Sequence, residues 1–189
     1  MVADKRHPSP YLVGNTDYGV MGQIFQDRIR ESDVLVDVGC GNGRVINWWL
    51  SRGLRNKIIG VEIQEEVAKR TRRRLRRYPN VEIITGDAVE NLPPDGTLFY
   101  LANPFDATTV RRFKAKMREH CARRDDIRII YYACVQVGVF SEDPSWSIEE
   151  FVIARPALAV CFEERHSRLG VIRYVGEPSD RVPGYQPRS

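Results

Sequence analysis

At 189 residues, 42% of them hydrophobic and 29% charged, the chain has the size and composition of one folded domain. It contains no apolar run long enough for a membrane helix, and its first residues lack the apolar segment of a signal peptide. We therefore expect a cytoplasmic protein with no membrane association. The cysteines are scattered without metal-ligand spacing, which argues against a disulfide scaffold and a zinc site: Cys40, Cys121, Cys134 and Cys161.

Apolar runs alternate with helical patterns along the chain, which predicts a parallel sheet with crossover helices. An N-terminal helix is expected at about 18–29. Strands are expected at residues 34–38, 57–62, 81–85, 97–102 and 127–132, with helices between them at about 45–52, 65–78 and 107–122. Further strands are expected at 146–153, 157–163 and 171–175, the last two as a candidate hairpin. The division expected within a single domain 1–189 is an arm and helix (1–30), an α/β core (31–176) and a loose tail (177–189).

The first expected strand runs directly into a glycine-rich turn. Asp37 lies near the end of the strand, and Gly39, Gly41 and Gly43 follow before the next helix begins. Glycines let the backbone turn sharply and approach a ligand closely. The turn also lies at the positively polarised start of a helix. This pattern predicts a binding site for a nucleotide-type cofactor.

The spacing of the glycines distinguishes between cofactors. A dinucleotide-binding loop needs its third glycine one residue later, where this chain has Arg44. The Asp-x-Gly-x-Gly-x-Gly arrangement instead resembles the first motif of class I S-adenosylmethionine-dependent methyltransferases. That cofactor has no pyrophosphate but carries an ammonium, a carboxylate and a sulfonium, so Asp37 suits it chemically. A nicotinamide-type loop or a purely structural turn remains the alternative.

Two further strands are followed by carboxylates. Glu62 ends the strand 57–62, and ligands in such sheets bind beyond the carboxyl ends of the strands. There it can accept both ribose hydroxyls, or alternatively cap the next helix. Asp87 follows the strand 81–85, and the methyltransferase resemblance places it beside adenine, where it accepts the exocyclic amine. The alternative is an ordinary Gly-Asp turn.

The fourth motif is Asn103-Pro104-Phe105-Asp106. It resembles the [Asn/Asp]-Pro-Pro-[Tyr/Phe] motif of methyltransferases that act on planar or sp² nitrogens, with one proline missing. The resemblance implies that Asn103 holds the target amine and that the ring of Phe105 lies against the substrate. Losing a proline changes the turn that aims this ring. Asn-Pro is also a common strand-ending turn.

These motifs cover about residues 34–106 and together resemble small, poorly characterised bacterial class I methyltransferases with Gly-Cys-Gly-x-Gly-Arg and Asn-Pro-Phe motifs. The resemblance implies a Rossmann-like α/β fold, with a mostly parallel seven-stranded sheet and an antiparallel strand near the C-terminus. It also implies that residues around 15–18 fold over the methionine end of the cofactor, the alternative being a flexible arm. The implied cofactor site is Asp37, Gly39, Cys40, Gly41, Gly43, Glu62, Ile63, Asp87, Ala88 and Asn103. The implied catalytic residues are Asn103, Pro104, Phe105 and Asp106.

The predicted function is transfer of the methyl group of S-adenosylmethionine to a nucleophile, with nitrogen favoured. The acceptor could be a small molecule, a protein amine or RNA. A cofactor-binding or scaffold protein without catalysis and an NAD-dependent oxidoreductase are the alternatives. The arginine-rich helix 65–78 is either a solvated face or a site for a polyanion.

Overall fold

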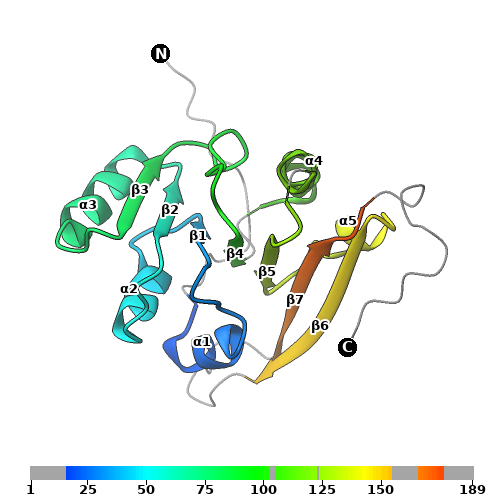
Figure 1. The fold of residues 1–189 in the computed structure, drawn as a ribbon, viewed down its shortest axis with the longest axis horizontal. Coiled ribbons are helices and arrows are strands. Elements are labelled where there is room, and N and C mark those ends of the chain that lie inside the picture. The colour runs from blue at the N-terminus through cyan, green and yellow to red at the C-terminus, as the bar shows by residue number, and fades with distance from the viewer. Residues whose placement is uncertain (1–15, 103–104, 123, 155–165, 177–189) are drawn as a thin grey trace.

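A computed structural model describes residues 16–102, 105–122, 124–154 and 166–176 (Figure 1). The helices are α1 (Tyr18–Phe25), α2 (Arg44–Ser51), α3 (Glu65–Leu75), α4 (Ala107–Cys121) and α5 (Gly138–Ser141). The strands are β1 (Leu35–Val38), β2 (Ile58–Glu62), β3 (Val81–Thr85), β4 (Leu98–Ala102), β5 (Arg128–Tyr132), β6 (Trp146–Ala154) and β7 (His166–Tyr174). The predicted division into arm, core and tail stays a prediction.

The strands form one seven-stranded sheet in the order β3-β2-β1-β4-β5-β7-β6. The pairs among β1 to β5 are parallel, and β7 runs antiparallel to both β5 and β6. The predicted Rossmann-like fold with a mostly parallel sheet is therefore confirmed. After β1 the chain adds β2 and β3 on one side and then returns to place β4 on the other. Beyond the carboxyl ends of β1 and β4 lies the point where such sheets bind ligands.

One strand pairing predicted from the sequence is wrong. Both edges of β7 are occupied, because Ile172 pairs with Ile129 of β5 and with Ile148 of β6. A hairpin between 157–163 and 171–175 is therefore excluded, and the partner of β7 in the hairpin is β6. Segment 157–163 itself lies outside the described residues. Strand β7 begins earlier than the predicted strand 171–175, because its first residues are polar and do not form an apolar run. One of them, Arg168, forms an ion pair with Glu150 of β6.

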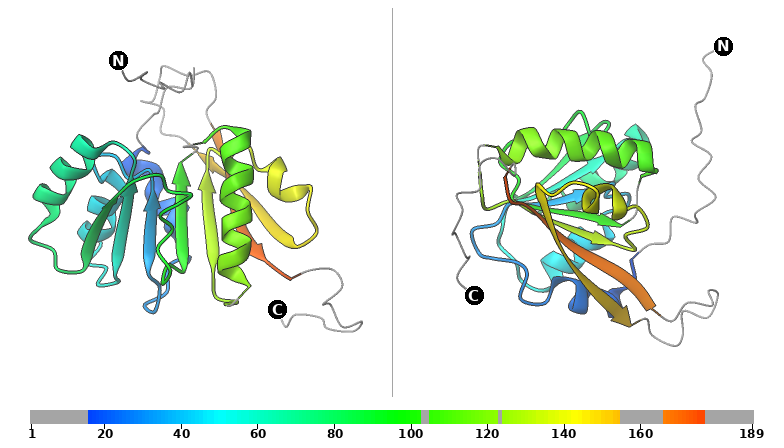
Figure 2. Two further views of the ribbon diagram at one scale, coloured as in Figure 1. Left: turned by 90° about the horizontal axis from the view of Figure 1, so that it is seen from above. Right: turned by 90° about the vertical axis from the view of Figure 1, so that its right-hand side faces the viewer.

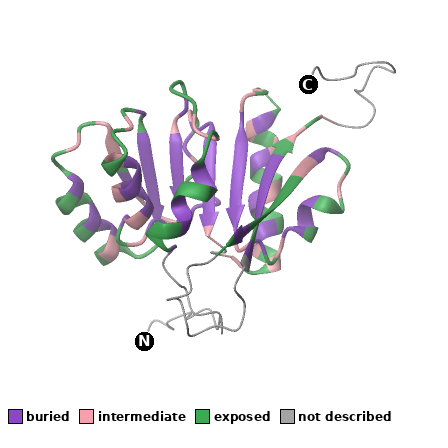
Figure 3. Ribbon diagram, turned by 90° about the horizontal axis from the view of Figure 1, so that it is seen from below, coloured by how far each residue is buried: buried purple, intermediate pink, exposed green. Residues whose placement is uncertain are grey.

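Helices cover both faces of the sheet, which explains why the central strands are mostly apolar and buried. Helix α4 packs Val110, Phe113 and Met117 against one face. Helices α1 and α2 cover the opposite face, with α3 beside α2 (Figure 2). The strands between these layers are buried along most of their length (Figure 3). The parallel strands therefore form a packed platform that holds the strand ends in fixed positions.

Gly60 in the middle of β2 provides a direct test of this packing. A Cβ there would lie 2.7 Å from Cys40 Sγ and 2.9 Å from side-chain atoms of Ile46 and Ile83. We expect Gly60→Ala to lower the free energy of unfolding by about 1–3 kcal/mol through overpacking. Gly22→Ala is the matched control, because its Cβ would meet no atom within 4 Å and alanine favours the helix. Urea unfolding of both variants checks this, and equal stabilities would contradict it.

Candidate functional site

The glycine-rich turn is fixed to the end of the neighbouring strand β2. The amides of Gly39 and Cys40 both donate to the carbonyl of Val61, at 2.9 and 3.0 Å. Gly41 has a φ of 50°, which disfavours other residues, and a Cβ built on it meets nothing within 4 Å. The turn thus presents an open backbone surface at the carboxyl edge of the sheet, as the sequence predicts for a cofactor loop.

Glu62 connects this turn to the start of α3. Its side chain is buried, with Oε2 accepting from the Gly41 amide at 2.9 Å and Oε1 accepting from the Gln64 amide at 2.8 Å. The bond to Gln64 is a contact with the start of α3, as expected from the alternative prediction that Glu62 caps this helix. Each carboxylate oxygen can accept two hydrogen bonds, so both retain capacity for a ligand. Glu62 is therefore held in place and still able to receive two hydroxyl donors.

Asp37 is a buried carboxylate at the centre of the same edge. None of the described residues donates a hydrogen bond to its Oδ2 atom. Burial, with a further contribution from the nearby charge of Glu62, raises the pKa of Asp37 to about 7. A buried acceptor without a donor is costly for a folded chain. The carboxylate is thus suited to a ligand that brings a positive charge or a hydrogen-bond donor.

Tyr100 and Arg44, which none of the sequence motifs identified as site residues, hold Thr16, just before α1, beside the edge of the sheet that carries Asp37. Tyr100, which pairs with Asp37 across β1 and β4, shares a hydrogen bond of 2.8 Å with the hydroxyl of Thr16. Arg44 donates through Nε to the Thr16 carbonyl at 2.7 Å and lies over the ring of Tyr18. Burial raises the pKa of Tyr100, so its hydroxyl stays protonated. Only residues 16–18 of the predicted covering segment are described, and Asn15 lies outside the described residues.

Three further residues of the predicted cofactor site differ in exposure. Asp87 is half-buried, with Oδ1 accepting from the Val89 amide at 2.8 Å and Oδ2 lying 3.8 Å from Arg112. Ile63 is 64% exposed and directly follows Glu62, whereas Ala88 is buried. An exposed apolar side chain next to a buried acid is suited to cover the face of a flat ring.

Cys40 lies in the loop, but its side chain does not point toward the open edge. The thiol packs in the core cluster that covers β2, and Gly60 leaves the space for its sulfur. Burial raises the pKa of Cys40, and the charges of Asp37 and Glu62 raise it further. The thiol therefore stays neutral, and Cys40 contributes to the loop through its backbone.

Asn103 and Pro104 lie outside the described residues, so the structure describes only the end of the fourth motif. The ring of Phe105 packs against Phe113 of α4, with 5.8 Å between ring centroids. Asp106 is the N-cap of α4 and accepts from the Thr109 amide at 2.7 Å. This placement gives Asp106 a structural task and turns Phe105 toward the core.

Within the described part of the chain, no group of histidine, cysteine and acidic side chains is arranged to hold a metal ion. Among the same residues, none of the helices combines the length and apolar character needed to cross a membrane.

Residues 35–125 match the model of a family described as a methyltransferase domain. This match places a methyltransferase domain within these residues. The predicted fold is confirmed by this match together with the observed sheet. The domain match covers the glycine turn, Glu62, Asp87 and the Asn103 motif. These positions together therefore correspond to the part of the fold that the family shares.

Two curated relatives match part of the chain. The "Probable ribosomal RNA small subunit methyltransferase A" of Methanopyrus kandleri is 29% identical over 87 residues, which is 46% of this chain and 31% of the relative. The ribosomal RNA small subunit methyltransferase A of Thermotoga petrophila is 32% identical over 109 residues, covering 48% of this chain and 41% of the relative. The chain thus spans less than half the length of either relative.

Solved structures extend the match in three dimensions. An RNA methyltransferase from Salinibacter ruber, in complex with S-adenosyl-L-homocysteine, aligns with a TM-score of 0.57 and 16% identity over 93% of this chain and 100% of that chain. The 23S rRNA methyltransferase ErmE aligns with a TM-score of 0.60 and 19% identity over 86% of this chain and 70% of that chain. At these identities the likeness establishes the fold.

Proposed function

We propose that this chain is an enzyme that transfers the methyl group of S-adenosylmethionine to a nitrogen of an RNA base. The observation that carries the proposal is the pair of buried carboxylates, Asp37 and Glu62, beside an open glycine turn. RNA is proposed as the acceptor because both curated relatives are named as ribosomal RNA methyltransferases. A cytoplasmic location stays a prediction.

The residues present are suited to this cofactor. Glu62 would accept from the ribose hydroxyls, since both its oxygens retain acceptor capacity. Asp37 would receive the ammonium of the methionine portion, which supplies the donor that its Oδ2 lacks among the described residues. Asp87 would accept from the adenine amine, with Ile63 against the ring. When bound, the cofactor supplies a methyl group already activated by the sulfonium.

The protein's contribution to such a transfer is alignment and exclusion of water. The Thr16–Tyr100 hydrogen bond holds the segment before α1 next to the strand position that pairs with Asp37. Asn103 would hold the amine by its hydrogens, so that the nitrogen lone pair faces the methyl group. A strong base is needed only if the nucleophile arrives protonated at neutral pH. Asp106, occupied as a helix cap, is better placed to orient this motif than to remove a proton.

Replacing Glu62 tests the cofactor site directly. We expect Glu62→Ala to weaken binding of S-adenosylhomocysteine by about 1–3 kcal/mol, because the ribose acceptors and the Gly41 anchor are both lost. Glu62→Gln, which keeps one acceptor oxygen, should lose less. Glu66→Ala is the control, since Glu66 is exposed on the next helix. Calorimetric titration measures all three, and an unchanged affinity in folded Glu62→Ala would refute the ribose role.

The reaction itself is tested by transfer of labelled methyl from S-adenosylmethionine to RNA, to DNA and to protein. RNA should be labelled, and nuclease digestion should place the label on a base nitrogen. Asn103→Ala should lower this turnover while leaving the affinity for S-adenosylhomocysteine nearly unchanged. Retained turnover would remove the amine-holding role. Tight binding of S-adenosylhomocysteine without transfer to any acceptor would instead support a cofactor-binding protein without catalysis.

A further inference from the structure

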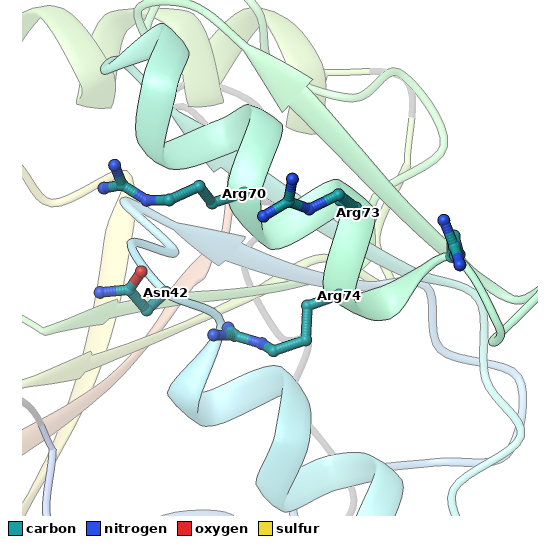
Figure 4. A pocket seen from close by; sticks show the side chains of 5 residues that line it. Asn42, Arg70, Arg73 and Arg74 are labelled. Atoms are coloured by element: carbon teal, nitrogen blue, oxygen red, sulfur yellow. The ribbon is translucent and has the colours of Figure 1, made fainter.

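A hollow of about 490 Å³ lies between α3 and the glycine turn. Neither Asp37 nor Glu62 lines it, so it is separate from the two buried carboxylates. Figure 4 shows the side chains of Arg70, Arg73 and Arg74 extending from α3 toward the turn that carries Asn42. We call these residues the arginine hollow: Asn42, Arg70, Arg73, Arg74 and Arg76.

The guanidinium groups of the arginine hollow are not neutralised by the protein. Among the described residues, none of its four arginines forms an ion pair. Other cations of α3 behave differently: Lys69 lies 2.9 Å from Glu65 and 3.1 Å from Glu66. Arg72 donates to the Ile83 carbonyl at 2.7 Å. The uncompensated charge is therefore concentrated on the side of α3 that lines the hollow.

The start of α2 adds to this positive field. One terminal nitrogen of Arg74 lies 3.8 Å from the position that a Cβ on Gly43 would take, so the guanidinium lies against the N-cap of α2. Helix α2 has no acidic residue in its first turn and no side-chain cap at Gly43. A cation beside a helix N-terminus is unfavourable by itself, whereas an anion there is stabilised by the helix and by arginine. The arrangement is complementary to an anion.

We propose that the arginine hollow binds phosphate groups of the RNA strand that carries the methyl acceptor. Guanidinium groups match phosphate oxygens in pairs, and several phosphates along one strand would engage several arginines of one helix face. The net charge of the whole chain is only +4, so the attraction is local to this surface. Such contacts position a strand without reading its sequence. The identity of the strand as RNA rests on the proposed function.

The test compares two triple variants with the same change in net charge. The first variant, Arg70→Gln/Arg73→Gln/Arg74→Gln, removes three of the four cations of the hollow. All three positions are exposed, and glutamine is compatible with the helix. Lys57→Gln/Lys116→Gln/Arg173→Gln removes three cations that are paired with acids on other surfaces. Binding of a fluorescent single-stranded RNA of mixed sequence is followed by anisotropy over a series of salt concentrations.

For the hollow variant we expect the affinity to fall about tenfold or more, and the slope of log affinity against log salt to decrease by about 2. The control variant should stay within about threefold of the wild type, and S-adenosylhomocysteine affinity should be unchanged in both. Equal losses in the two triple variants, an unchanged salt slope, or no RNA binding by the wild type would overturn the proposal. A parallel loss of S-adenosylhomocysteine affinity would assign the arginines to the cofactor site and overturn it as well.

Unlabelled polyglutamate and unlabelled RNA are compared as competitors at equal concentrations of negative charge. If polyglutamate displaces the fluorescent RNA as strongly as RNA does, the occupant is an acidic protein and the RNA assignment is refuted. The outcome for the proposed function is read separately, from methyl transfer. RNA binding that depends on the hollow, without label on any RNA, would leave the hollow assigned and remove the proposed reaction. If the hollow variant labels RNA with full activity, the proposed reaction is supported and the role of the hollow is refuted.

Discussion

Arg128→Met is expected to lower the free energy of unfolding by about 3–5 kcal/mol, because it leaves a buried carboxylate without its cation. Arg128 begins β5 and lies 2.6 Å from both oxygens of Asp33, with both side chains almost completely buried. Thr97 donates to the same carboxylate at 3.0 Å, and Arg128 also donates to the carbonyl of Arg28 at 2.8 Å. This network joins β5 to the segment before β1, at the amino ends of the strands and away from the cofactor edge.

Urea unfolding at neutral pH measures the loss. The double variant Asp33→Asn/Arg128→Met should recover more than half of it, since a neutral amide of the same shape removes the isolated charge. Binding of S-adenosylhomocysteine by the folded fraction of either variant should match the wild type. A loss below about 1 kcal/mol in Arg128→Met would show that the pair contributes little more than an exposed one.

The parallel half of the fold could be predicted because its strands are short apolar runs separated by helical patterns. Strand β1 is buried along its whole length, so its sequence shows no alternation that could be mistaken for a surface strand. The hairpin of β6 and β7 was harder. Residues 149–152 of β6 are exposed on both faces, and charges pair across the strands, as Glu149 does with Arg173. Local patterns do not specify such partners, since pairing depends on what the sheet edge leaves open.

The candidate site divides in the same way. The positions of the glycine turn, Asp37 and Glu62 could be predicted because they lie at the carboxyl ends of strands that must meet at one edge. Tyr100 and Thr16 could not, because their contact joins residues 84 positions apart. One signal was present: a tyrosine inside a buried apolar strand needs a partner for its hydroxyl. The N-cap role of Asp106 could also be predicted, since an aspartate directly before a helical pattern is a typical N-cap.

Asp37→Asn is expected to stabilise the cofactor-free protein at alkaline pH and to weaken cofactor binding. Burial raises the pKa of Asp37 to about 7, from 3.8 for an unperturbed carboxyl. The folded chain therefore holds a proton that the unfolded chain releases between these pH values. The wild type accordingly loses stability as pH rises from about 4 through 7, whereas asparagine does not titrate. The advantage of the variant should grow by on the order of 2–3 kcal/mol between pH 5 and pH 8.

Thermal unfolding without cofactor at these two pH values measures the first effect, and calorimetric titration with S-adenosylhomocysteine at pH 8 measures the second. The variant should bind at least about tenfold more weakly, because asparagine has no charge to offer the ammonium. Wild-type affinity should rise with pH through about 7 as Asp37 ionises. A variant that is less stable at pH 8 and binds normally would make Asp37 a structural residue. Greater stability combined with weaker binding in the variant would show that the buried Asp37 carboxylate destabilises the free protein and serves to bind the ligand.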